Sequence, residues 1–231
     1  MMTVSSTIAL GFLLVLAAGA AQATELKQAN AVYTVTRDGS AIGDSNFSLK
    51  QNSDGTWTLT SETKGTSGKA RLLGIDVREE SVFRWNGGKP QSVVYDYHQN
   101  SMIKSRTRHI EFDAAAQQAH SQENKDRFTY ATPPGTTDRS TLQLLLAAAV
   151  AEGKNEITAP VAVRDRAEEQ RYTVAKNETV QVPAGSFSAT RVERTDGKAI
   201  NWYAANVGLL PVKVQQISGD GSTVVLELKQ K

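Results

Sequence analysis

Alternation of apolar and polar residues with a period of two constrains the fold of this chain more than any other feature. Val, Thr, Tyr and Trp recur in six alternating segments, residues 31–37, 56–64, 92–98, 188–195, 210–217 and 223–229. This period is typical of strands with one buried face and one wet face. Asp-Gly or Asn-Gly dipeptides, which provide the positive φ angles of tight hairpins, occur at 38–39, 54–55, 86–87, 196–197 and 220–221. The pattern predicts a long antiparallel sheet whose consecutive strands are joined by hairpins.

One helix is predicted at about residues 138–152, after a Pro-Pro-Gly turn at 133–135. Thr137 or Asp138 can cap its first amides, and Gly153 suits its C-terminal end. Its apolar stripe comprises Leu142, Leu145, Leu146, Ala149 and Val150, and Leu144, Ala147, Ala148 and Ala151 widen that stripe past half of the circumference. A helix that is apolar nearly all round should be enclosed. We therefore predict a mainly β fold: a long curved antiparallel sheet, a half-open barrel, wrapped around one central apolar α-helix.

The N-terminal residues predict export. The run from Ile8 to Ala18 is apolar except for Gly11, and it is too short to span a bilayer comfortably. The residues Ala21-Gln22-Ala23 fit a signal-peptidase site, so we expect cleavage after Ala23 and a location in the periplasm. The mature chain, residues 24–231, is expected to form a single half-barrel domain without a transmembrane segment. It contains no cysteine, so packing alone must hold it together.

Several classes of function lose their main support in the sequence. The formal net charge is only +2 and is spread along the chain, which argues against a nucleic-acid partner. No Gly-x-Gly-x-x-Gly or Gly-x-Ser-x-Gly motif occurs, so no nucleotide cofactor is expected. A hairpin turning near Ala114 would place His109 opposite His120, but two imidazoles are too few for a zinc site and no cysteine is available. We expect no metal and no cofactor.

Six stretches together resemble a family of exported bacterial proteins, domain of unknown function 3108. These stretches cover most of the mature chain and are found at residues 33–49, 78–97, 112–118, 138–146, 182–194 and 201–216. The most specific phrases are the residues 183–187, PAGSF, and 209–212, LLPV. The resemblance implies a half-open β-barrel similar to that of lipoprotein-sorting carriers, in which a curved sheet wraps a helix. It implies no catalytic residues, because the family has no agreed activity.

These observations favour a non-enzymatic protein that binds an apolar or lipid-like ligand on the concave face of its sheet, since apolar concavities are the usual small-molecule sites. The residues expected to line the site are Leu142, Leu145, Leu146, Ala149 and Trp202. Arg139, at the start of the helix, is the expected contact for an anionic head group. The competing interpretation of the leucines and alanines is a filled core that leaves no cavity.

Two other functions stay open at this stage. The first is an interaction or scaffold protein of the cell envelope, because the free edges of an open barrel can recruit a strand of a partner protein. The second is a hydrolase of an unrecognised type. It ranks last because the sequence shows no pairing of a nucleophile with a base.

Overall fold

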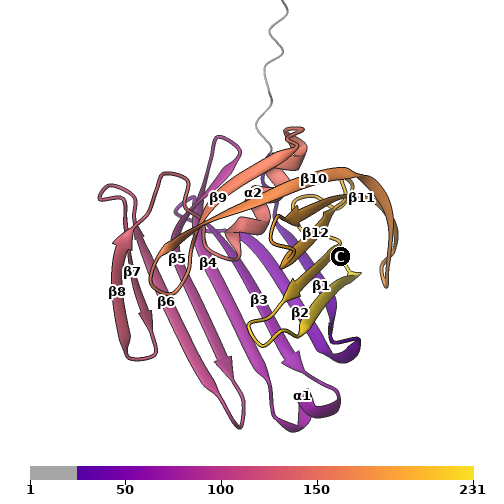
Figure 1. Cartoon of the computed structure of the whole chain (residues 1–231). Coiled ribbons are helices and arrows are strands. Elements are labelled where there is room, and N and C mark those ends of the chain that lie inside the picture. Colours follow the sequence, from indigo (N-terminus) through magenta and orange to yellow (C-terminus); the bar gives the residue numbers. More distant parts are fainter. Residues whose placement is uncertain (1–24) are drawn as a thin grey trace, which may run out of the picture.

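The computed structural model describes residues 25–231, so the predicted signal peptide and its cleavage site after Ala23 lie outside the described residues. The described chain forms fourteen strands and two helices (Figure 1). In chain order the elements are β1 (Ala29–Arg37), β2 (Ser40–Gln51), β3 (Trp57–Gly65), α1 (Gly68–Leu72), β4 (Asp76–Asn86), β5 (Lys89–Asn100), β6 (Ser105–Asp113), β7 (Gln118–Glu123), β8 (Asp126–Ala131), α2 (Thr141–Ala151), β9 (Glu156–Ala162), β10 (Ala167–Val182), β11 (Gly185–Arg194), β12 (Ala199–Tyr203), β13 (Lys213–Ile217) and β14 (Thr223–Gln230).

All fourteen strands belong to one sheet, in the order β8-β7-β6-β5-β4-β3-β2-β1-β14-β13-β12-β11-β10-β9. Each neighbouring pair is antiparallel, and every pair except β1–β14 is consecutive in the chain. The β1–β14 pair joins the strands nearest the two ends of the described chain. It thereby connects β1–β8 and β9–β14 into one continuous sheet. The sheet is not closed, because β8 and β9 are its edges. The predicted mainly β fold with a long antiparallel sheet is confirmed.

The five predicted turn dipeptides all lie at connections between strands that are consecutive in the chain, although Asn86 is itself the last residue of β4. At the first of them, Asp38 and Gly39 have φ angles of 48° and 75°, which are the two positive angles of a tight two-residue hairpin. The strands alternate as expected: in β1 the side chains of Ala31, Tyr33 and Val35 are buried and those between them are not. Local sequence therefore sets both the hairpins and the buried face.

The described chain has two helices rather than one, because the short helix α1 forms between β3 and β4. Five residues complete little more than one turn, so α1 is too short to show an apolar stripe in the sequence. The longer helix, α2, begins at Thr141, within the predicted range. Asp138 and the next two residues precede it as a capping turn. Neither described helix is long and apolar enough to cross a membrane.

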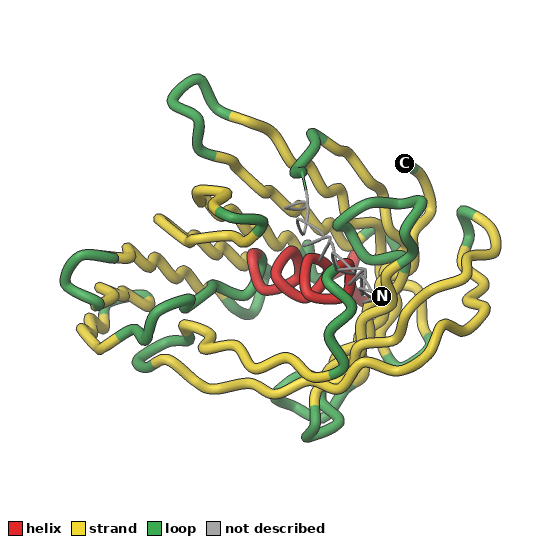
Figure 2. Tube along the Cα trace, turned by 90° about the horizontal axis from the view of Figure 1, so that it is seen from above, coloured by secondary structure: helices red, strands yellow, loops and turns green. Residues whose placement is uncertain are grey.

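Helix α2 is buried on more than one side. Leu144 belongs to one apolar cluster with Tyr33 and Phe83, whereas Leu146 belongs to another with Ile157. The helix packs against β5 and β9, which lie in opposite halves of the sheet order. Figure 2 shows strands on either side of this helix. This two-sided burial accounts for an apolar surface that extends nearly all round the helix.

The two sheet edges are connected at one end by contacts other than strand pairing. The segment before α2 runs beside β9: the Thr137 amide donates to the Pro160 carbonyl at 2.9 Å, and the Ala162 amide donates to the Thr137 carbonyl at 2.8 Å. The Tyr130 hydroxyl of β8 donates to the Val163 carbonyl at 2.9 Å. Arg164, just after β9, lies 3.7 Å from the Glu123 carboxylate of β7. These contacts hold β8 close to β9.

Replacing Glu123 with glutamine is expected to weaken this connection. The Glu123 carboxylate accepts hydrogen bonds from Arg106 and Arg108, each at 2.8 Å, and only 11% of its side chain is exposed. Burial raises its pKa, but the two guanidinium groups outweigh burial and lower it overall. We expect E123Q to lose about 1–2 kcal/mol of unfolding free energy at neutral pH, since charge-assisted hydrogen bonds are lost.

The lowered pKa of Glu123 also predicts how the effect of E123Q on stability changes with pH. A carboxylate with a lowered pKa in the folded state stabilises the fold above its usual pKa, and this contribution is lost as the pH falls through the folded-state value. The difference between the wild type and E123Q in urea denaturation should therefore shrink in acid. The exposed Glu156 provides the control E156Q, for which we expect a change within about 0.5 kcal/mol. A difference that stays constant with pH would contradict the assignment.

Candidate functional site

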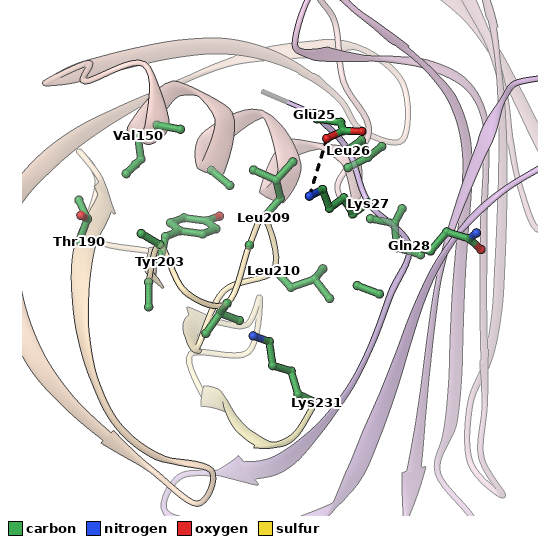
Figure 3. Close-up of a pocket in the computed structure, with 18 of the residues that line it drawn as sticks. Glu25, Leu26, Lys27, Gln28, Val150, Thr190, Tyr203, Leu209, Leu210 and Lys231 are labelled. Carbon is green, nitrogen blue, oxygen red and sulfur yellow. Dashed lines mark ion pairs between the residues drawn. The ribbon is translucent and has the colours of Figure 1, made fainter. Parts of the chain in front are cut away.

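A cavity with a volume of about 720 Å³, called the large cavity below, lies beside the C-terminal half of α2 (Figure 3). Helix α2 contributes Ala147, Val150 and Ala151 to its wall. The remaining lining comes from the start of the described chain, residues 25–30, from Leu49, Asn177, Ser188, Thr190, Tyr203 and Lys231, and from the β12–β13 connection at residues 204–210. The wall thus brings together both ends of the described chain and one helix.

Small side chains account for the space. Ala147 and Ala151 lie one helical turn apart, so they form a shallow stripe on one face of α2. Opposite them, the β12–β13 connection carries Leu209 and Leu210 into the wall, after Gly208 turns the backbone with a φ of 95°. Figure 3 shows the Leu209 and Leu210 side chains between the helix and the first described residues. The result is a mostly apolar chamber.

Tyr203 forms the inner wall of this cavity. Its side chain is buried, and its hydroxyl donates to the Gln143 carbonyl of α2 at 2.9 Å. Burial raises its pKa well above the usual value, so the phenol stays neutral. Its ring belongs to the same apolar cluster as Leu146 and Val192. Gln143 and Leu146 line a second, smaller hollow, so Tyr203 lies between the large cavity and residues that border this hollow.

Charged side chains lie at the rim of the large cavity. Lys27 and Glu25 form an ion pair at 3.7 Å, and the side chains of both are about four-fifths exposed. The Lys231 ammonium group donates to the Asn206 carbonyl at 2.7 Å. Figure 3 shows both lysines on the cavity side of the wall. The chamber therefore combines an apolar interior with a rim that carries two ammonium groups and the Glu25 carboxylate.

The five residues predicted to line a ligand site do not line this cavity. Leu142 and Leu146 line the smaller hollow, of about 170 Å³, and Leu145 and Ala149 line another of about 130 Å³. The large cavity borders a different face of α2 from Leu145 and Ala149. A ligand-lining role for the four α2 residues stays a prediction that concerns the small hollows.

Trp202 points away from Tyr203, because neighbouring residues of a strand face opposite sides of the sheet. Its indole nitrogen donates to the Glu178 carboxylate, and the Lys213 ammonium group lies 5.7 Å from its ring centre. The hairpin of β10 and β11 covers this side, where Val180 and Val182 join Trp202 in one apolar cluster. Trp202 is thus placed under a hairpin and outside the cavity wall.

Arg139, the predicted head-group contact, borders the smaller hollow. Its guanidinium donates to the Gln216 amide oxygen at 3.1 Å and lies 3.9 Å from the Glu79 carboxylate. Arg108, Arg194 and Lys198 line the same hollow, so four cationic side chains meet there. The first two have carboxylate partners, Glu123 for Arg108 and Asp196 for Arg194. Arg139 therefore borders the smaller hollow and does not line the large cavity.

Asp138 holds α2 in place. Its buried carboxylate accepts hydrogen bonds from the Ser140 and Thr141 amides at 2.8 and 2.9 Å, so it caps the helix as predicted. It also accepts from the Ser81 hydroxyl of β4 at 2.8 Å and from the Ser92 hydroxyl of β5 at 2.6 Å. The same carboxylate therefore caps the helix and fixes it to two strands. Burial raises its pKa.

The histidine hairpin differs from the prediction by two residues in register. Glu111 lies opposite His120, and His109 lies opposite Gln122, because the β6–β7 turn has four residues rather than two. His109 instead contacts the Asp96 and Glu111 carboxylates at 2.8 and 3.2 Å. Among the described residues, no group of three or more His, Asp or Glu side chains has the arrangement of a metal site.

A family match extends over nearly the whole sheet. A family model described as protein of unknown function (DUF3108) matches residues 32–229, which run from β1 to β14. The chain belongs to this family. No curated protein matches this DUF3108 member significantly. A crystal structure of a beta-barrel-like protein of the domain of unknown function DUF1849 from Brucella abortus is similar in fold, with 11% identity and a TM-score of 0.50. The match covers 89% of the DUF3108 chain and 97% of the other.

Sequence reasoning named α2 as the candidate ligand wall but chose other positions on it. Val150 and Ala147 belong to the apolar surface of the predicted helix, and the Leu209-Leu210 pair stands out as a dense apolar cluster. The sequence could have indicated the orientation of Tyr203, because it directly follows Trp202 and neighbouring residues of a strand face opposite sides. Which side borders a cavity depends on residues far apart in the chain.

Proposed function

We propose that this protein binds an apolar or amphipathic molecule, such as an acyl chain, in the large cavity, and that it acts in the periplasm as a non-enzymatic carrier. The observation that carries the proposal is the chamber of about 720 Å³ beside α2, lined mostly by Ala, Val and Leu side chains. Its size falls within the range of about 300–1,000 Å³ that is usual for small-molecule sites. The predicted signal peptide supports the location.

The architecture explains why such a chamber can exist. In the proposed arrangement the curved sheet encloses α2, and small residues on one face of the helix leave the space unfilled. Lys27 and Lys231 at the rim favour an anionic head group, since ammonium groups attract carboxylate or phosphate. Arg139 would contact the ligand only if the chain extended past Tyr203 into the smaller hollow.

The test introduces a bulky side chain on the face of α2 that borders the large cavity. The control introduces the same side chain on another face of the helix. Val150 lines the large cavity, whereas Leu145 lies on the other side of the same helix and is also half-buried. The probe is the fluorescent fatty acid 11-(dansylamino)undecanoic acid, titrated into the wild type, V150W and L145W. We expect micromolar binding by the wild type, a loss of about tenfold or more in V150W, and little change in L145W.

Three results would overturn the proposal. These are a wild type that fails to enhance dansyl emission, V150W binding as tightly as the wild type, and L145W weakening binding as much as V150W. Thermal unfolding of each variant shows whether the fold is kept. Because all three proteins share the same N-terminal residues, adsorption of the probe to that segment would affect them equally and cannot mimic the expected difference.

A role in binding an envelope protein is the second candidate, and the observation in its favour is the edge strand β8. Strand β9 is partly covered by the segment at Thr137, but β8 pairs with β7 alone. The exposed Asp126 and Arg127 on β8 are charged, which discourages unselective strand addition. Absence of probe binding by the wild type would favour this candidate over the carrier.

A further inference from the structure

Three of the four large apolar side chains that are exposed in the described chain gather at one end of the sheet. Leu72 of α1 is 76% exposed, and Met102 and Ile103 of the β5–β6 turn are 80% and 78% exposed. The fourth, Ile217, lies elsewhere, at the end of β13. Single exposed apolar residues are ordinary, but a group of them marks an interaction site. We call Leu72, Met102 and Ile103 the apolar tip.

Backbone and side-chain hydrogen bonds hold the apolar tip together. The Met102 amide donates to the Leu73 carbonyl at 2.9 Å, which joins the β5–β6 turn to the end of α1. The Ser101 hydroxyl accepts from the Lys104 amide and donates to the Lys104 carbonyl, both at 3.0 Å. This closed turn presents Met102 and Ile103 at its apex. These hydrogen bonds therefore hold the end of α1 and the β5–β6 turn in position.

Helix α1 is anchored so that its charged and apolar side chains face outward. Ala70 is buried, and the Ser67 hydroxyl donates to the Ala41 carbonyl at 2.6 Å. The neighbours Lys69, Arg71 and Leu72 are exposed. A helix of one turn that buries a single alanine is held by its flanking hydrogen bonds, and it leaves Leu72 available for another surface.

The charges around the apolar tip are mainly positive, and the neighbouring carboxylate is that of the exposed Asp76, which lies opposite Asn100. Residues 66–75 and 101–105 contain Lys69, Arg71 and Lys104, all exposed, and neither segment contains Asp or Glu. Basic residues next to exposed Leu, Ile or Met side chains form the combination that binds the interface of an anionic bilayer. Each cation near such a surface adds electrostatic attraction, and the apolar side chains enter the boundary between head groups and acyl chains.

We propose that the apolar tip and its three cations dock the protein peripherally on a bilayer surface that contains acidic phospholipids. The contact points out from the end of the sheet that carries α1, the lower end in Figure 1. Helix α2 and the first described residues lie at the upper end. The docked protein would therefore present the rim formed by residues 25–30 away from the bilayer. This proposal stands without the ligand-binding proposal, because it uses none of the cavity residues.

The experiment reports insertion at one chosen residue. The chain has no cysteine, so M102C or I217C can each be labelled at a single site with the environment-sensitive fluorophore NBD. Full-length labelled protein is mixed with vesicles of phosphatidylethanolamine containing about one quarter phosphatidylglycerol, and with vesicles of phosphatidylcholine. We expect a blue shift and roughly a twofold or greater gain in emission at residue 102 with the anionic vesicles only. Emission at residue 217 should not change.

Two further variants separate charge from apolar contact, each in the M102C background. Charge reversal in K69E/R71E/K104E and apolar loss in L72D/I103D should each abolish the blue shift. The proposal fails if the fluorophore at residue 102 does not respond to anionic vesicles, if residue 217 responds equally, or if either variant keeps the full response. The site of the label also distinguishes docking through the tip from anchoring through the apolar residues 8–18, which would leave the emission at residue 102 unchanged.

Discussion

Replacing Asp138 with alanine is expected to destabilise the protein by about 2–5 kcal/mol, because one carboxylate both caps α2 and binds two strands. Loss of a helix cap costs about 1–2 kcal/mol, and each hydroxyl left unsatisfied in the core adds about 1–3 kcal/mol. The hydroxyl at risk is that of the buried Ser81, whereas the Ser92 hydroxyl keeps its contact with the Thr141 hydroxyl at 2.8 Å. Urea denaturation measures the loss. The matched control is D113A, since Asp113 caps an exposed turn through the Ala116 amide.

The D138N variant tests the electrostatic part of the same contact. Burial raises the pKa of Asp138, although Ser92, Thr141 and Ser81 donate to it and oppose the rise. A raised folded-state pKa means that the contribution of this group is fully present below the usual carboxyl pKa and is lost as the pH rises through the folded value. The unfolding free energy of the wild type minus that of D138N should therefore decrease between about pH 4 and pH 7. An increase over this range would show that the ionised form is the stabilised one.

The second large effect is expected for Tyr203→Ala. The Tyr203 ring is buried between α2 and the sheet, and its truncation should cost about 3–5 kcal/mol through lost burial and the void that remains. Y203F keeps the ring and loses only the hydrogen bond to the Gln143 carbonyl, so a cost of about 1 kcal/mol is expected. Thermal or urea unfolding of both variants gives the comparison. Similar losses in the two variants would show that the hydroxyl, rather than the ring, holds α2.

The same pair of variants probes the boundary between the two spaces. With the ring removed, the large cavity and the hollow lined by Gln143 and Leu146 should become continuous. If Y203A folds, it is expected to bind longer acyl probes better than Y203F does, because the chain can then extend toward Arg139. An equal preference for chain length in the two variants would contradict the placement of Tyr203 between the spaces.

The six alternating segments correspond to β1, β3, β5, β11, β13 and β14, so alternation did not predict the other eight strands, and β7 and β8 show the clearest reason. Strands β7 and β8 have the sequences QAHSQE and DRFTYA, and neither shows a run of alternating large apolar residues. They lie at or next to the sheet edge, where little apolar area has to be buried. The segment 210–217 was predicted as one strand, but β13 begins only at Lys213. Pro211 has no amide hydrogen, and its carbonyl accepts from the Tyr33 hydroxyl at 2.8 Å instead of from a neighbouring strand.

The sequence by itself determined the mainly β class, the antiparallel hairpins and the burial of α2. These properties depend on local φ preferences, on the period of two, and on an apolar helix surface that water would not favour. Tertiary structure alone decided which part of the helix borders a cavity. Because α2 is apolar nearly all round, its periodicity selects no face, and contacts with β5, β9 and the 204–210 connection make the choice. Alternation likewise sets Trp202 and Tyr203 on opposite sides of their strand, but only the packing of distant segments of the open sheet decides which side faces the cavity.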